Sequence, residues 1–197
     1  MKWTDTGVGD FQQPPTGTHL ARCYGLIDIG TQKSEYKGQT VIRRQVILRW
    51  ELPTELMEDG RPFSVSKFYT QSLNEKSNLY ADLVNWRGRE FTKDELSGFD
   101  AKAILDKTCL LSITMNDKGK ARVTGLMKGP KHMEVPPRVN DLVFFSLESD
   151  EFDQNTFNAL SEGIQKMIRL SPEWADLNSS KPHANGTRDD LDDDIPF

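Results

Sequence analysis

Residues 41–52 carry the strongest strand signal in the chain, and their sequence is Val41-Ile42-Arg43-Arg44-Gln45-Val46-Ile47-Leu48-Arg49-Trp50-Glu51-Leu52. Such a run of apolar, aromatic and β-branched residues is typical of a strand, whose side chains alternate between two faces. The polar face carries Val41, Arg43, Gln45, Ile47 and Arg49, and the core face carries Ile42, Arg44, Val46, Leu48, Trp50 and Leu52. This parity favours a buried Trp50 over one that stacks on a ligand. Pro53 is expected to end the strand.

Four further runs have strand character, and they are Thr18–Ile29, Phe63–Gln71, Cys109–Met115 and Ala121–Leu126. The first run is followed by a predicted loop from Gly30 to Gly38, which holds Lys33, Tyr36 and Lys37. Glu58–Pro62 and Asn116–Gly119 have the composition of tight turns, so the last two strands should form a hairpin. Residues 1–17 are rich in glycine and proline, which predicts an irregular lead-in.

Three segments have helical character. Ser77–Trp86 places Leu79, Leu83 and Trp86 at helical spacing, and Ala101–Asp106 is a shorter candidate. Asn155–Leu170 is predicted to be one amphipathic helix, with its apolar face formed by Phe157, Leu160, Ile164 and Met167. After Trp174 the composition turns to Asn, Ser, Lys, Pro, Gly and Asp, which cannot build a core. We therefore expect disorder from about residue 178.

The predicted order of elements is strand, strand, strand, helix, strand, strand. This is the order of an OB-fold, a five-stranded Greek-key barrel that binds oligonucleotides through its second and third strands and two of its loops. A different small barrel or an unrelated α+β domain would give the same order. The expected division is an OB-like body over 1–147, a helical extension over 148–177, and a disordered linker with an acidic tip over 178–197.

Composition narrows the class of protein. A chain of 197 residues, 36% of them hydrophobic, suits one domain with appendages. No apolar stretch is long enough for a membrane span and the N-terminus lacks a signal peptide, so a soluble, cytoplasmic protein is expected. Cys23 and Cys109 lie in apolar runs, which favours buried free thiols over a disulfide. His19, His132 and His183 are scattered, so no metal site is expected.

No enzyme signature stands out in the sequence. Gly119-Lys120 lacks the flanking residues of a phosphate-binding loop, because Thr114 replaces the first glycine and Ala121 the magnesium-binding Ser or Thr. The carboxylates of the body are spread without the spacing of a nuclease site. We expect neither catalysis nor a cofactor, and a metal-dependent nuclease is the alternative among enzymes.

Charge is divided unevenly along the chain. Residues 1–147 contain 21 basic and 18 acidic residues, whereas residues 148–197 contain 4 basic and 12 acidic residues. The formal net charge of −5 therefore combines a mildly basic body with a strongly acidic C-terminal part. A basic body is compatible with a nucleic-acid partner, which the overall charge alone would not suggest.

The chain ends on Asp189-Asp190-Leu191-Asp192-Asp193-Asp194-Ile195-Pro196-Phe197. The acids attract a basic surface, Phe197 offers one ring for a pocket, and the terminal carboxylate can be clamped by an arginine. A merely solubilising tail would not need Ile195, Pro196 and Phe197. We therefore interpret this segment as a docking peptide.

The last six residues, Asp192, Asp193, Asp194, Ile195, Pro196 and Phe197, resemble the acidic C-terminal tip of bacterial single-stranded DNA-binding proteins. That resemblance implies an OB-fold and the recruitment of replication, recombination and repair enzymes, which grip the terminal Phe in a pocket with a basic rim. The body is more similar to phage-encoded single-stranded DNA-binding proteins, through Tyr24–Gln32, Tyr36-Lys37-Gly38 and Trp50-Glu51-Leu52-Pro53.

Binding of single-stranded DNA needs cations for phosphates and flat rings for bases. Strand parity indicates that one sheet face could hold Arg22, Tyr24, Arg43, Arg49, Lys67 and Tyr69, with Phe68 on the opposite, core side. The loops would add Lys33, Tyr36 and Lys37 from one side, and Lys118, Lys120 and Arg122 from the other. The alternative is an ordinary solvated sheet face.

Two further interpretations remain open at this stage. The helix over residues 155–170 packs against the barrel or joins two subunits as a homodimer. The protein binds single-stranded DNA and recruits host enzymes, or it binds no DNA and its tip only mimics that of the host protein. The tip is the same under both functions, so the body must distinguish them.

Overall fold

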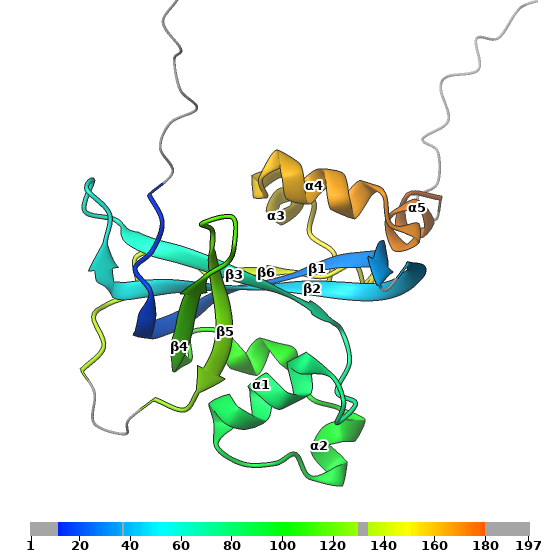
Figure 1. Cartoon of the computed structure of the whole chain (residues 1–197). Helices are drawn as coiled ribbons and strands as arrows, with labels where there is room; N and C mark the ends of the chain where they lie inside the picture. The colour runs from blue at the N-terminus through cyan, green and yellow to red at the C-terminus, as the bar shows by residue number, and fades with distance from the viewer. Residues whose placement is uncertain (1–11, 37, 130–133, 180–197) are drawn as a thin grey trace, which may run out of the picture.

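The computed structural model describes residues 12–36, 38–129 and 134–179 (Figure 1). Its strands are β1 (Gly17–Tyr36), β2 (Gln39–Leu56), β3 (Pro62–Thr70), β4 (Thr108–Met115), β5 (Ala121–Met127) and β6 (Val143–Phe145). The helices are α1 (Asn78–Arg87), α2 (Lys93–Ser97), the 3-10 turn η1 (Ala101–Ile104), α3 (Gln154–Ala159), α4 (Glu162–Arg169) and α5 (Pro172–Ser179). The prediction of a mainly β fold with helices is confirmed.

The strands form one sheet in the order β3-β2-β1-β4-β5, and β6 adds to β1 in parallel. All other pairings are antiparallel. β1 belongs to three ladders, because Gly17–Arg22 pairs with β4, the stretch from Arg22 to Tyr36 pairs with β2, and Gly25–Ile27 pairs with β6. No ladder joins β3 to β5 among the described residues, although the two strands approach each other. The sheet is therefore open between these two edges.

The predicted loop from Gly30 to Gly38 is wrong, because β1 continues to Tyr36 and pairs there with Gln39 of β2. Lys33, Ser34 and Glu35 are all exposed in this two-stranded ribbon, so the alternation that marks a half-buried strand is missing. Gly30 sits at a register shift with φ 70°, and a Cβ there would lie 2.5 Å from Ser171. Glycine is thus required at this bend.

β2 also extends past Pro53 to Leu56, which corrects the expected end of the strand. A register shift between Leu52 and Leu56 accommodates the proline, which has no N–H to donate. The other turns match expectation, since β2 and β3 connect around Gly60 and β4 and β5 connect through Asn116–Gly119.

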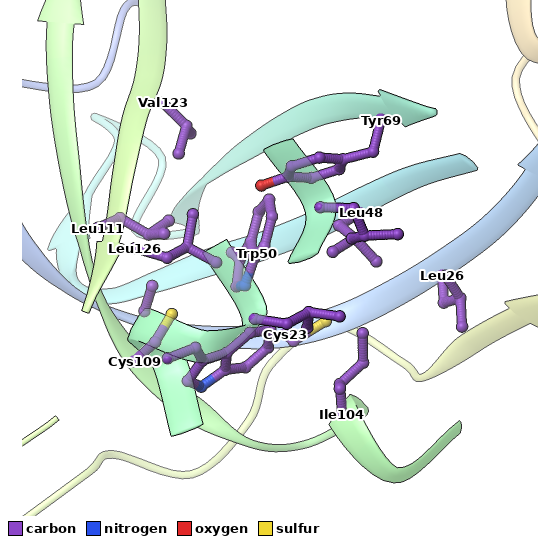
Figure 2. Packing of buried hydrophobic residues seen from close by; sticks show 14 of the residues in the cluster. Cys23, Leu26, Leu48, Trp50, Tyr69, Ile104, Cys109, Leu111, Val123 and Leu126 are labelled. Atoms are coloured by element: carbon purple, nitrogen blue, oxygen red, sulfur yellow. The ribbon is translucent and has the colours of Figure 1, made fainter. Parts of the chain in front are cut away.

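The main core lies on the inner face of β2, the face of Val46, Leu48, Trp50 and Leu52 (Figure 2). Trp50 is fully buried and its ring centroid lies 6.2 Å from that of Trp86 on α1, which confirms the prediction of a core tryptophan. Cys23 and Cys109 are buried free thiols in the same cluster, as predicted. Burial raises the pKa of the Cys23 thiol to about 12.

A second core covers part of the opposite, outer face of the sheet, on the side of α3–α5 in Figure 1. Ile27 and Ile29 of β1 and Ile47 of β2 pack there against Phe157 and Ile168. The prediction that Ile47 lies on a polar face is therefore wrong, because both faces of this part of β2 are buried. The alternation of apolar residues along β2 predicted one core, whereas the fold has two.

The predicted helix over residues 155–170 is two helices, because Leu160 is extended with ψ 152° between α3 and α4. Phe157, Leu160 and Ile164 are nevertheless buried, Met167 is partly buried, and Ile168 joins them. The amphipathic face thus packs on the sheet of its own chain. α5 prolongs this packing, since Trp174 stacks on Phe157 at 4.3 Å. α5 continues to Ser179, so the disorder expected from about residue 178 does not begin there; residues 180–197, with the rest of the predicted linker and the tip, lie outside the described residues.

Candidate nucleic-acid interface

The two tyrosines of the predicted binding face are buried. Tyr24 is 8% exposed and donates to Ser64 Oγ at 3.3 Å, while Tyr69 is 3% exposed and donates to Asp82 Oδ2 at 2.7 Å. Burial together with the adjacent Asp82 raises the pKa of Tyr69 well above its usual range. The prediction that these rings face outward is wrong, because both side chains are buried.

β3 has the opposite parity from the one predicted. Lys67 and Tyr69 point inward and share the carboxylate of Asp82, with Lys67 Nζ 2.6 Å from Oδ2. Asp82 on α1 thus accepts from both the Lys67 ammonium and the Tyr69 hydroxyl, which would otherwise point into the core without a partner. Phe68 points outward and is 50% exposed. The exposed aromatic ring of β3 is therefore that of Phe68 and not that of Tyr69.

The arginines of the predicted face are also separated. The Arg22 side chain is 15% exposed and lies 3.8 Å from Asp106. Arg49 is half-buried and lies over Gly25, where an added Cβ would be only 3.0 Å from Arg49 Cβ. Arg43 is exposed, and no described residue forms an ion pair with it. Of the six residues predicted to share a face, Arg43 is the most accessible cation.

The predicted loop cations lie at two separate hairpin ends. Lys33 is exposed on the β1–β2 hairpin, opposite Ile42, and Tyr36 pairs with Gln39 through its backbone. Lys118 and Lys120 are exposed around the β4–β5 turn, and Arg122 is exposed on β5. Lys37 lies outside the described residues.

A hollow of about 660 Å³ lies at the C-terminal end of β3, between β2 and the loop before α1, and we call it the β3-edge hollow. It is lined by Arg43, Gln45, Phe68, Tyr69, Thr70, Ser72, Asn74, Lys76, Ser77 and Asn78. None of these described lining residues is acidic, and two of them, Arg43 and Lys76, are cationic. Phe68 supplies an exposed ring, and the seven remaining lining residues all carry an amide or a hydroxyl group. Cations, an aromatic ring and polar donors are the groups that single-stranded nucleic acid requires.

The loop before α1 is held rigidly in this hollow. Ser77 caps α1 by accepting from Tyr80 N at 3.0 Å, and its hydroxyl donates to Ser72 O at 2.6 Å. Asn74 Oδ1 accepts from Lys76 N at 3.0 Å, which closes a local turn. These bonds fix the backbone that carries Lys76 before any ligand arrives.

A second hollow of about 510 Å³ borders the same strand on the side of β4 and β5. It shares Asn78 with the β3-edge hollow, and its other lining residues include Lys67, Asp82, Asn116, Asp117 and Arg122. Since Asp82 pairs with Lys67, Arg122 is the cation of this hollow that makes no ion pair within the described part of the chain. A single-stranded nucleic acid that extended from the β3-edge hollow into this second hollow would pass Arg122.

Sequence reasoning missed Phe68, Lys76, Asn74 and Asn78. A usable signal existed for Phe68, because Ser64 and Ser66 share its face, whereas Phe63 and Val65 share the face of Lys67 and Tyr69. That alternation marks the face of Phe63 and Val65 as the core face of β3. Lys76, Asn74 and Asn78 carry no such pattern, since the fold of a loop brings them to the hollow.

Neither a metal centre nor a membrane-spanning helix is found in the parts of the chain that the structure describes. Among the described residues, no cluster of three or more His, Cys, Asp or Glu side chains is arranged to hold a metal ion. None of the helices is both long and apolar enough to cross a bilayer. In comparisons with known proteins, no family model and no curated protein matches the chain.

Proposed function

We propose that this protein binds single-stranded DNA along the free edge of β3 and recruits DNA-processing enzymes through its acidic tip. The observation that carries the proposal is the β3-edge hollow, where Phe68 is exposed among polar groups and two cations with no acidic lining residue. Bases would stack on Phe68, and phosphates would contact Arg43 and Lys76. The hydroxyls and amides of the hollow would bind sugar and base edges.

The topology supports an OB-fold-like body. β1 is shared between β2 and β4, α1 follows β3 and precedes β4, and the remaining gap lies between β3 and β5. An OB-fold is a partly open Greek-key barrel of five strands that binds oligonucleotides near strands 2 and 3. In this chain α3–α5 cover part of the outer face, so the strand would run along β3 and not across the whole sheet.

The tip gives the second half of the proposal. Asp192, Asp193 and Asp194 would approach a basic partner surface, and Phe197 would enter a pocket on it. This is the role that the resemblance to bacterial single-stranded DNA-binding proteins implies. The partners would be host replication, recombination and repair proteins if the chain is phage-encoded, as the similarity of its body implies. Linking the tip to a DNA-bound body raises the local concentration of those enzymes.

A titration with labelled oligothymidylate at several salt concentrations tests the DNA half. The fluorescent label belongs on the oligonucleotide, because Trp50 and Trp86 are buried and their intrinsic fluorescence would respond weakly to DNA binding. Each phosphate contact contributes about 0.7 to the slope of log affinity against log salt for a single strand. We expect Arg43→Gln and Lys76→Gln each to lower the slope by about 0.7, while Lys107→Gln, at an exposed site between η1 and β4, leaves it unchanged.

The same titration distinguishes the alternative function. If the wild-type protein shows no affinity for the oligonucleotide but its tip peptide still binds host enzymes, the protein mimics the host tip and does not coat DNA. If affinity exists but neither substitution changes the slope, DNA binds elsewhere on the body.

A further inference from the structure

An apolar pocket of about 270 Å³ lies on the inner side of β2, and we call it the inner pocket. Ser72 lines both this pocket and the β3-edge hollow, whereas Phe68 and Arg43 line only the hollow. Its floor is formed by buried side chains of β1, β2, α1 and η1, which are Leu26, Val46, Leu48, Leu79, Leu83 and Ile104. Protein interiors are close-packed and rarely leave spaces larger than a water molecule. An opening with an apolar floor and polar groups at its rim has the character of a small-molecule site.

Charged groups are organised around the mouth of the inner pocket. Arg44 lies between two carboxylates, with its Nη2 2.5 Å from Asp28 Oδ2 and 2.8 Å from Glu148 Oε1. Lys102 Nζ lies 2.6 Å from Glu151 Oε1 and 4.3 Å from the ring centroid of Phe144. Asp28, Arg44, Glu148 and Glu151 all line the pocket.

The balance of these charges selects the kind of ligand. Three carboxylates lie near two cations, so although each of these groups has an ion-pair partner, the mouth keeps one formal negative charge in excess. The Glu148 side chain remains 57% exposed, so it can accept from a further donor. Glu151 N donates to Glu148 O at 3.0 Å, which holds the two acidic residues on one turn. The mouth therefore attracts a cation and repels phosphate, so the inner pocket does not belong to the DNA path.

We propose that the inner pocket binds a small organic amine, with an aromatic or branched apolar body on the leucine floor and its ammonium group beside Glu148 and Glu151. The volume corresponds to about nine water molecules at about 30 Å³ each, which suits a ligand of about ten non-hydrogen atoms. Charge complementarity at the mouth and apolar contact at the floor would act together. This site is independent of the proposed DNA binding.

Three probes with the same ring test the site: tryptamine, indole and indole-3-acetate, titrated into the full chain by NMR. We expect the affinity order tryptamine, then indole, then indole-3-acetate, with shifts around Leu48, Leu83 and Ile104. The double variant E148Q/E151Q should weaken tryptamine roughly fivefold and leave indole unchanged, because each exposed ion pair contributes modestly. Saturating oligothymidylate should not displace tryptamine.

A matched pair of variants tests the location. Ala101 lines the pocket and is exposed, whereas Ala103 is exposed on the same turn and does not line it. Ala101→Phe should abolish tryptamine binding, and Ala103→Phe should keep it, with thermal melts showing that both variants fold. The proposal is overturned if tryptamine fails to bind at millimolar concentration, if indole-3-acetate binds equally well, or if Ala101→Phe binds like wild type.

Discussion

Arg43 and Arg44 are adjacent in the sequence, yet they point to opposite sides of β2 and have opposite electrostatic surroundings. Arg43 lines the β3-edge hollow, where no described lining residue is acidic. Arg44 lies at the mouth of the inner pocket between Asp28 and Glu148, and the hydrogen bond to Asp28 raises the pKa of its guanidinium above the usual range. One arginine is available to a phosphate, and the other is already neutralised.

A count of basic residues therefore does not locate a nucleic-acid site. What matters is whether each cation is already paired and which hollow it faces. The same holds on β3, where Lys67 is paired with Asp82 while the ring of the neighbouring Phe68 is exposed.

The largest effect is expected for Arg44→Met, which should lower the free energy of unfolding by about 3 kcal/mol in urea denaturation. It leaves the carboxylate of Asp28, 8% exposed, without its ion pair. Adding Asp28→Asn should recover much of the loss, since the unpaired charge is then gone. DNA affinity should be unchanged. A loss of stability no larger than that of Arg43→Gln would contradict the assigned difference between the two arginines.

The next effect is on DNA binding. Phe68→Ala should weaken oligothymidylate binding by about 1–3 kcal/mol, roughly 5- to 150-fold, because one stacking ring is removed. Stability should change little, since the ring is 50% exposed. Leu56→Ala is the matched control, as Leu56 is 57% exposed on β2 but does not line the hollow. Equal affinities for the two variants would exclude Phe68 as a stacking platform.

Deleting residues 189–197 should have a smaller effect on DNA and a complete effect on partners. If the acidic tip competes with phosphates for cations that are not already paired, its removal should tighten DNA binding a few-fold at low salt and hardly at all at high salt. Capture of host repair enzymes should be lost. If DNA affinity at low salt is unchanged, the competition is excluded and recruitment stands on its own.

The smallest effect concerns the mouth of the inner pocket. The hydrogen bond from Lys102 holds the pKa of Glu151 below its usual value of 4.5. A carboxylate with a lowered folded-state pKa stabilises the protein above the unfolded pKa, and this contribution is lost as the pH falls through the folded value. Urea denaturation between neutral pH and pH 3 should therefore show a slightly smaller loss for Glu151→Gln than for wild type. Equal losses of stability in the two proteins would show that the Lys102–Glu151 ion pair contributes nothing to the free energy of unfolding.

Strand positions and the main core were largely predictable, because alternation in residues 41–52 correctly placed Leu48 and Trp50 inside. The failures have physical causes. The ribbon from Gly30 to Tyr36 is polar on both faces, so it lacks the pattern of a strand, and Leu160 breaks a helix whose apolar spacing continues on both sides. Ile47 is buried because helices far away in the sequence cover it.

The candidate site was only partly predictable. Arg43 and Arg122 were identified and line the two hollows, whereas Tyr24 and Tyr69 proved to be buried. Lys76 and Asn74 enter the site through a loop whose shape depends on Ser72 and Ser77. The inner pocket had no sequence signal, since it needs α1, η1 and the turn at Glu148 to meet beside β2.

The most direct test of the central claim is photocrosslinking of the full chain to an iodouridine-substituted oligothymidylate, followed by mapping of the crosslinked peptide by mass spectrometry. A base that stacks on the open ring of β3 should crosslink at Phe68, and Phe68→Leu should remove that product. A crosslink mapped to a residue outside the β3-edge hollow, or undiminished crosslinking in Phe68→Leu, would contradict the proposed path of the DNA strand.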